Sequence, residues 1–262
     1  MTRMITDRSR LRFYRVQRNG TPRYVIDDGT RWRLLEGDLF GRYEAGDEIP
    51  PEPESVLAPV VPSKIVAIGR NYADHAAEFD NPLPQEPLIF LKPSTAVIGP
   101  GEPIVLPAGA GRVDHEAEVG LVIGRHASHV SEEEAPECIF GLTCVNDVTA
   151  RDLQKRDVQF TRAKSFDTFA PIGPCIGTGI DYRAGVALEG WVNGARRQAS
   201  TTKSLVFSFE RLIAFVTSVM TLLPGDIIST GTPAGVGPLA FGDRVTVKVA
   251  GVGELTNPVR HS

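Results

Sequence analysis

The chain has 262 residues, of which 42% are apolar and 23% charged, and its formal net charge is −4. This length is enough to bury one large core, and the absence of a Lys/Arg run argues against a nucleic-acid partner. No apolar stretch is long enough for a membrane span, and the first residues lack the apolar segment of a signal peptide. We therefore expect a cytoplasmic protein with no membrane partner.

The chain's 26 glycines and 20 prolines indicate many turns and favour a β-rich architecture. Its cysteines, Cys138, Cys144 and Cys175, show no spacing typical of a zinc site or a redox motif. We expect them to be reduced, buried and without a chemical role.

Residues 10–49 contain short apolar runs separated by Asn-Gly and Asp-Gly pairs, which predicts an antiparallel β meander. A proline-rich stretch without periodicity follows it. We predict a small N-terminal β domain with its linker over residues 1–58, and a main domain over residues 59–262.

The main domain alternates strands with short helices. Asn71 and Thr149 stand where N-caps of two short helices are expected, and Ser131 with Glu134 forms a capping-box pattern. The Asn-Gly pair at 193–194 predicts a hairpin. The further expected elements are strands at 64–69, 87–93, 118–124 and 142–147, one long helix at 208–226 with Leu212, Phe215, Val216 and Val219 on one face, a strand entering a glycine-rich loop at 226–237, and a final hairpin at 243–259.

Two carboxylates stand at the start of an apolar run, in VDHEAEVGLVIG. Because side chains alternate along a strand, Glu116 and Glu118 share one face, about 7 Å apart along the backbone. His115 points to the other face, and we expect it to pack or to support the site rather than to bind a ligand. The simplest explanation of the two acids is a solvated strand end. A third acid, Asp147, ends a second apolar run, and three oxygen ligands without Cys or His suit Mg²⁺, then Mn²⁺ or Ca²⁺.

A second group of reactive side chains lies in the expected helix after residue 71. His75 and Glu78 are three residues apart, so they can touch on one helical face. A carboxylate on one imidazole nitrogen raises the basicity of the other, which suits a general base that activates water. An ordinary surface pair is the alternative. Lys164, in a polar irregular segment, could hold a substrate carboxylate, and Thr232 lies in a glycine-rich loop that lacks the P-loop ending.

Several long segments together resemble the fumarylacetoacetate hydrolase superfamily. They are VAIGRNYADHAAEF, PLIFLKPSTAVIGPG, VDHEAEVGLVIG, GLTCVNDVTARDLQ, RAKSFDTFAPIGP, VNGARRQAS and LLPGDIISTGTPAGVGP, and they run from about Ser63 to Val259. The chain is most similar to the short branch that holds acylpyruvate hydrolases, oxaloacetate decarboxylases or tautomerases, and hydroxyheptadienedioate isomerases.

The resemblance implies a mixed β-rich α+β fold, described as a β-sandwich roll, with a small N-terminal β domain and a homodimeric assembly. It implies Mg²⁺ or Mn²⁺ as the cofactor, no organic cofactor, and a small keto-acid substrate. The site residues that it implies are Glu116, Glu118 and Asp147 for the metal; His75, Glu78 and Lys164 for catalysis; and Thr232, Arg151 and Gln154 for the substrate, with Arg70 and Lys92 as weaker candidates for substrate charge.

The chemistry implied is hydrolysis of a C–C bond in an acylpyruvate-like diketo acid through an enolate that the metal stabilises. The same enolate supports an isomerase, a tautomerase or a decarboxylase, and the fold does not choose among them. A binding or scaffold protein that has kept the fold is the remote alternative. In that case, replacing Asp147 with Ala would leave function untouched.

Overall fold

The computed structural model describes residues 10–51 and 55–262, so residues 52–54 of the expected linker lie outside the described part. Over these residues the strands form three sheets. The largest sheet has the order β4 (Tyr43–Ile49), β3 (Trp32–Gly37), β2 (Thr21–Asp27), β1 (Arg12–Arg18), β14 (Ala170–Gly177), β12 (Ile139–Asn146), β11 (Ala117–Ile123), β17 (Ile227–Ser229), β6 (Lys64–Gly69) and β7 (Leu88–Pro93), with β5 (Ser55–Leu57) beside β1 and β8 (Val97–Ile98) beside β14.

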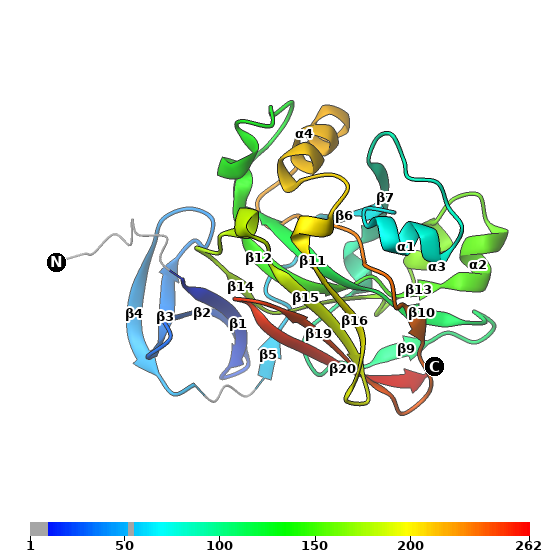
Figure 1. Cartoon of the computed structure of the whole chain (residues 1–262). Helices are drawn as coiled ribbons and strands as arrows, with labels where there is room; N and C mark the ends of the chain where they lie inside the picture. The colour runs from blue at the N-terminus through cyan, green and yellow to red at the C-terminus, as the bar shows by residue number, and fades with distance from the viewer. Residues whose placement is uncertain (1–9, 52–54) are drawn as a thin grey trace.

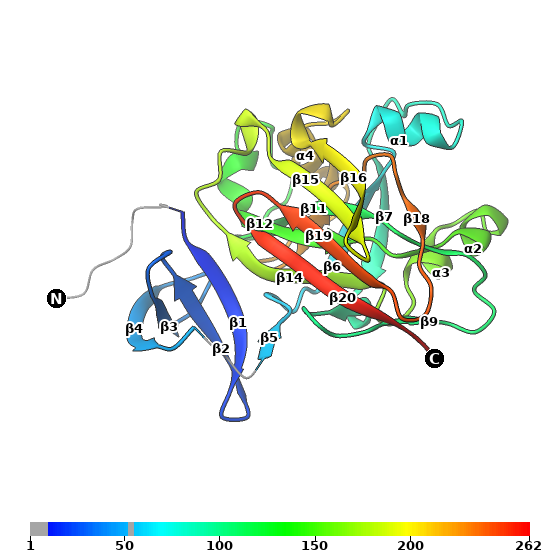
Figure 2. The same cartoon turned by 60° about the horizontal axis from the view of Figure 1, so that its bottom comes forward.

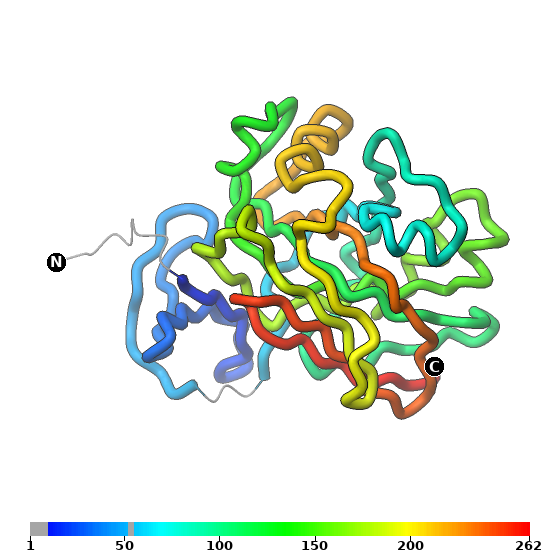
Figure 3. Tube along the Cα trace, in the orientation of Figure 1, coloured from blue at the N-terminus to red at the C-terminus, as the bar shows by residue number. Residues whose placement is uncertain are grey.

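Two smaller sheets complete the β structure. The five-stranded sheet lies in front of β11, β12 and β14 in Figure 2, and its order is β16 (Ala195–Thr201), β15 (Ala187–Val192), β19 (Arg244–Val249), β20 (Gly253–His261) and β9 (Ile104–Leu106). The three-stranded sheet has the order β13 (Thr149–Ala150), β10 (Val113–His115) and β18 (Gly237–Pro238). The parallel pairing of β20 with β9 places the end of the chain beside residues 104–106, as the tube in Figure 3 shows.

The helices are short and lie around the sheets (Figure 1). The α-helices are α1 (Ala73–Glu78), α2 (Arg151–Arg156), α3 (Thr161–Lys164) and α4 (Phe209–Val219), and the 3₁₀ segments are η1 (Ser94–Ala96), η2 (Ala135–Cys138), η3 (Tyr182–Ala184) and η4 (Thr202–Ser204). No helix of the described residues is long and apolar enough to cross a membrane. The β-rich α+β class predicted from the sequence is confirmed.

The main core lies between the large sheet, the five-stranded sheet and α4. Strand β11 shows the alternation that organises it: Val119 and Leu121 belong to this core, whereas Val122 belongs to a second core on the opposite face of the sheet. The three cysteines are buried and free, as expected. Burial on both faces of β11 explains why its sequence is an almost continuous apolar run.

The expected meander over residues 10–49 is present as β1 to β4. Strand β1 also pairs with β14, in the register Arg12 to Gly177 and Phe13 to Ile176, so the meander continues the large sheet. The predicted domain boundary at 58/59 stays a prediction. The Asn-Gly hairpin is confirmed: it joins β15 and β16, and Asn193 and Gly194 both have positive φ angles of 52° and 78°.

Three local predictions need correction. Asn71 does not cap α1; Tyr72 precedes the helix, and the Asn71 amide instead donates to the Thr230 carbonyl at 2.8 Å. Thr149 does not cap α2, because its hydroxyl donates to the Asp147 carbonyl at 2.8 Å. The expected helix over 208–226 is shorter, because α4 ends at Val219, which is 58% exposed rather than part of the buried face. The buried face of α4 consists of Phe209, Leu212, Ile213, Val216 and Thr217.

Candidate active site

Three buried carboxylates meet at the ends of two neighbouring strands. Glu116 lies between β10 and β11, Glu118 lies two residues later on β11, and Asp147 directly follows β12. The antiparallel register of β11 and β12 pairs Ala117 with Asn146, and the Asp147 N–H donates to the Glu116 carbonyl at 2.9 Å. These contacts bring one oxygen of each carboxylate within 4.8 Å of the other two. The set contains only hard oxygen donors, so it fits Mg²⁺ or Mn²⁺.

Buried cations surround two of these acids. The Lys164 ammonium donates to Glu116 Oε2 at 2.7 Å and to Asp147 Oδ2 at 2.6 Å. The fully buried Lys92 donates to Asp147 Oδ1 at 2.5 Å, and Arg151 binds the other oxygen of Glu116. Lys92, which the resemblance implied as a weaker candidate for substrate charge, instead lies fully buried and binds one of the predicted metal ligands, Asp147.

The third acid, Glu118, has a different environment. Its Oε2 accepts hydrogen bonds from the Ser229 hydroxyl at 2.5 Å and from the Gly231 N–H at 2.9 Å. Burial, with the negative charges of Asp147 and Glu116, raises the pKa of Glu118 to about 8. Burial alone would also raise the pKa of Glu116, but Arg151 and Lys164 outweigh burial and hold that pKa well below its usual range. A divalent cation beside Glu118 would relieve the repulsion that raises its pKa.

The His–Glu pair predicted from the sequence forms on α1. His75 Nδ1 lies 3.1 Å from Glu78 Oε2, and the other Glu78 oxygen accepts the Gly235 N–H at 3.1 Å. Since a carboxylate can only accept here, the imidazole carries its proton on Nδ1 and leaves Nε2 as the basic nitrogen. The pair therefore has the arrangement of an oriented general base.

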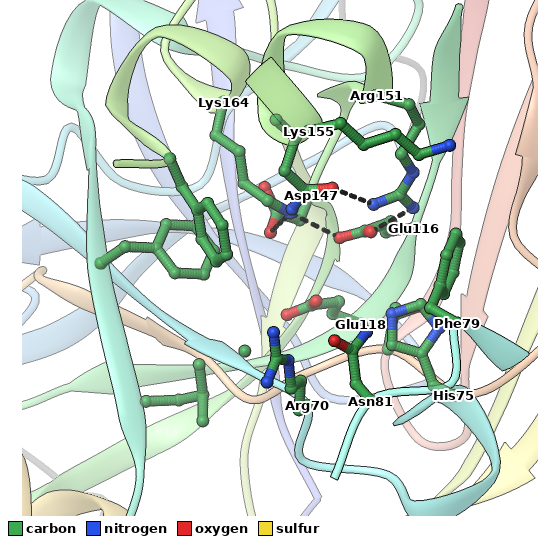
Figure 4. A pocket seen from close by; sticks show the side chains of 16 residues that line it. Arg70, His75, Phe79, Asn81, Glu116, Glu118, Asp147, Arg151, Lys155 and Lys164 are labelled. Atoms are coloured by element: carbon green, nitrogen blue, oxygen red, sulfur yellow. Dashed lines mark hydrogen bonds and ion pairs between the residues drawn. The ribbon is translucent and has the colours of Figure 1, made fainter. Parts of the chain in front are cut away.

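One pocket of about 310 Å³ brings these groups together. In Figure 4, Arg151, Lys155 and Lys164 lie on one side of the carboxylates, and Arg70, His75 and Asn81 lie on the other. Of the predicted site residues, those that line the pocket are Arg70, His75, Glu116, Glu118, Asp147, Arg151, Gln154, Lys164 and Thr232. Glu78 supports the pocket through His75. The volume suits a small molecule.

Two predicted substrate-binding residues are already engaged by protein groups. Arg151 donates to Asp114 at 2.8 Å and to Gln154 at 2.9 Å, besides its bond to Glu116. The Thr232 hydroxyl donates to the Ala117 carbonyl at 2.9 Å. The structure thus places both residues at the pocket, and their contacts with a substrate stay predictions.

Comparison with known proteins agrees with the geometry. Residues 64–260 match the family model described as fumarylacetoacetate (FAA) hydrolase C-terminal. The chain belongs to the fumarylacetoacetate hydrolase family. It is 42% identical over 217 residues to the protein named oxaloacetate tautomerase fahd2, mitochondrial, of Xenopus laevis, across 78% of this chain and 68% of that protein.

Solved structures that are similar to this family member cover nearly the whole chain. The 2-hydroxyhepta-2,4-diene-1,7-dioate isomerase of Mycobacterium marinum has a TM-score of 0.89 and 41% identity, over 96% of this chain and 99% of that one. The 5-carboxymethyl-2-hydroxymuconate delta-isomerase of Mycobacterium smegmatis has a TM-score of 0.87 and 44% identity, over 97% of this chain and 100% of that one. The fold inferred from the resemblance is confirmed.

Sequence reasoning missed two buried polar residues behind the site of this fumarylacetoacetate hydrolase family chain. Asp114 is fully buried and accepts from both Arg112, at 2.7 Å, and Arg151, at 2.8 Å. Gln198, on β16, contacts the loop that carries Thr232. Asp114 directly precedes the His115-Glu116 pair and lies among other charged residues, so no local signal in the sequence indicates its burial. Gln198 had no local signal, because its burial depends on how the five-stranded sheet packs against the large sheet.

Proposed function

We propose that the chain is a divalent-metal-dependent enzyme that acts on 2-oxo acids through an enolate, and that it hydrolyses a C–C bond of an acylpyruvate-like diketo acid. The observation that carries the proposal is the convergence of Glu116, Glu118 and Asp147 with the His75–Glu78 pair on one pocket. Glu116, Glu118 and Asp147 would hold Mg²⁺ or Mn²⁺, and when bound this ion would supply Lewis acidity for the developing negative charge on the substrate oxygens.

The chain's own residues would carry out the proton transfers. His75 accepts a proton from water at Nε2, and Glu78 stabilises the imidazolium that results. The hydroxide adds to the distal carbonyl carbon of the diketo acid. The C–C bond then breaks, its electron pair enters the pyruvate enolate, and a proton completes pyruvate. The Lys164 ammonium adds positive charge beside the developing oxyanion.

A second function, an isomerase or tautomerase, is favoured by the names of the relatives. The Xenopus laevis relative is named an oxaloacetate tautomerase, and the Mycobacterium marinum structure is titled an isomerase. The same pocket could move a proton between carbons of a 2-oxo acid without attack by water, or release CO₂ from a β-carboxylate. The homodimer and the cytoplasmic location also stay proposals.

Proton NMR of the purified protein with an acylpyruvate tests these functions. One tube contains Mg²⁺ and an identical tube contains Mg²⁺ with excess chelator. Pyruvate and the free acid, formed only without chelator, would support hydrolysis. An intact acyl chain with faster keto–enol exchange would replace the hydrolase by the isomerase or tautomerase. The same pair of tubes is then prepared with oxaloacetate. If the tubes with and without chelator give the same spectra for both substrates, the enzyme proposal is contradicted.

Substitution of His75 by Gln is the variant that tests the base. We expect turnover to fall by about 10²- to 10⁴-fold while Mg²⁺ affinity stays unchanged, because His75 is not among the oxygen ligands. His126→Gln, at an exposed position, is the matched control. Unchanged turnover in His75→Gln would remove the water-activation step.

A further inference from the structure

Gln198 is a buried polar side chain that links separate parts of the site. It lies on β16, is 1% exposed, and uses both ends of its amide. Its oxygen lies 3.0 Å from the Ala117 N–H and 3.1 Å from His115 Nδ1. Its nitrogen donates to the Thr232 hydroxyl at 2.7 Å and to the Pro233 carbonyl at 2.8 Å. The amide thus joins the strand of the predicted metal ligands to the loop of residues 230–235.

Two backbone groups determine the direction of every hydrogen bond in this network. The Ala117 N–H can only donate and the Pro233 carbonyl can only accept, so the Gln198 oxygen and nitrogen cannot be exchanged. His115 must therefore carry its proton on Nδ1. The Thr232 hydroxyl accepts from Gln198 and gives its own proton to the Ala117 carbonyl.

The loop held by Gln198 also reaches the proton-transfer pair. Its residue Gly235 donates its N–H to Glu78, which in turn contacts His75. Gly235 has a φ of +100°, and an added Cβ there would overlap the Arg197 carbonyl of β16. The loop therefore packs against Arg197 of β16, the residue before Gln198, and it also contacts α1 beside the pocket.

The sheet leaves room for the amide at one glycine. Gly190 on β15 is the register partner of Gln198, and an added Cβ at Gly190 would lie 2.7 Å from Gln198 Oε1 and 3.1 Å from the Ala117 Cβ. Any side chain at this position would push the amide away from Ala117. The space that accommodates Gln198 thus depends on the absence of a side chain on β15.

We propose that Gln198 is a positioning residue. It fixes the position of the His75–Glu78 pair relative to the carboxylates Glu116 and Glu118, because it holds the 230–235 loop against β11. The catalytic importance of this relative position rests on the proposed function. The proposal assigns the hairpin β15–β16 a part in catalysis although Gln198 is not among the residues that line the pocket.

Gln198→Glu is the main test, because it retains the shape and the acceptor oxygen but removes the donor end. A carboxylate cannot donate to Pro233, and even a protonated one donates a single hydrogen bond where the amide donates two. We expect kcat to fall about 10- to 100-fold, because a small displacement of catalytic groups is costly. Mg²⁺ affinity, measured by calorimetry, should change less than about threefold, since Ala117 stays bonded.

Gly190→Ala is the second variant, and it displaces the amide without changing Gln198. Gln17→Glu, on β1 in the N-terminal meander, is the matched control and should match wild type in both measurements. A kcat within threefold of wild type in folded Gln198→Glu would overturn the proposal. So would an equal loss of kcat and Mg²⁺ affinity, because that would indicate a general structural role.

Hydrogen exchange separates this proposal from the proposed function. Peptides that span residues 230–236 should exchange faster in Gln198→Glu than in wild type or Gln17→Glu, with no substrate present. If wild type converts no 2-oxo acid but this difference appears, the positioning of the loop stands and the proposed function fails. If the exchange of these peptides is unchanged, the positioning role is overturned, whatever the enzyme converts.

Discussion

Replacing Glu118 by Gln should make the metal-free protein more stable while it removes metal binding. Burial and two neighbouring carboxylates raise the pKa of Glu118 from 4.5 to about 8. The native state therefore keeps a proton at neutral pH that the unfolded chain releases, and the stability of the metal-free protein falls as pH rises from about 4.5 to about 8. A glutamine removes this penalty, because it carries no titrating proton.

The magnitude follows from the pKa difference. One pH unit of unequal protonation is worth about 1.4 kcal/mol, so the penalty is about 3 kcal/mol at pH 7 and about 1 kcal/mol at pH 5. The glutamine oxygen can still accept from the Ser229 hydroxyl and the Gly231 N–H, so no buried donor loses its partner. The net stabilisation by Glu118→Gln should therefore approach about 3 kcal/mol at pH 7.

Urea unfolding in excess chelator, at pH 7 and at pH 5, measures this difference. Glu44→Gln, at an exposed position of β4, is the control and should stay within about 0.5 kcal/mol of wild type. Added Mg²⁺ should reverse the order of stability, because only wild type gains binding free energy. Equal or lower stability of Glu118→Gln at both pH values would refute the electrostatic reasoning.

The remaining predictions concern the metal ligands and the loop. Asp147→Ala should abolish Mg²⁺ binding in calorimetry, and unchanged Mg²⁺ affinity would contradict the ligand assignment. The same variant should lower the free energy of unfolding in urea by about 3 to 5 kcal/mol, because it leaves Lys92 buried without its carboxylate. Calorimetry in two buffers of different ionisation enthalpy should show release of nearly one proton per Mg²⁺ at pH 7, from Glu118, and no release would argue against its raised pKa. Gly235→Ala should lower the urea midpoint of unfolding more than Gly242→Ala does. Both glycines have positive φ, but only Gly235 packs against a neighbouring backbone. Equal effects of the two substitutions would show that this packing is unimportant.

The parts of the site that the sequence could predict depend on local geometry. Strand alternation alone places Glu116 and Glu118 on one face, and helical spacing alone lets His75 reach Glu78. The structure confirms both of these local arrangements. The residues alone suggest that Asp147 joins the two glutamates as a metal ligand, but the meeting of this set with the His75–Glu78 pair in one pocket was accessible only through the family resemblance.

The rest depends on partners far away in the chain. Asn71 occupies a position typical of a helix cap, but its amide bonds to the Thr230 carbonyl, 159 residues later. Gln198 bonds to Ala117, 81 residues earlier, at a sheet position where one neighbouring strand contains a bulge. Local sequence rules contain no information about such long-range contacts, so they predict neither the bonds of Asn71 nor the network behind the site.

The pairing of β1 with β14 has a consequence for how the molecule avoids aggregation. Strand β1 covers the Ile176–Gly177 end of β14, and β8 covers the other end at Ala170 and Pro171. Without the meander, the Ile176–Gly177 end of β14 and the apolar side chains that pack around Phe13 would be exposed, and an open sheet edge is a template for association with other chains. The meander thus moves the exposed edge outward to β4, a strand rich in charged residues (Figure 1). The N-terminal strands form a protective border for the sheet that carries the candidate site.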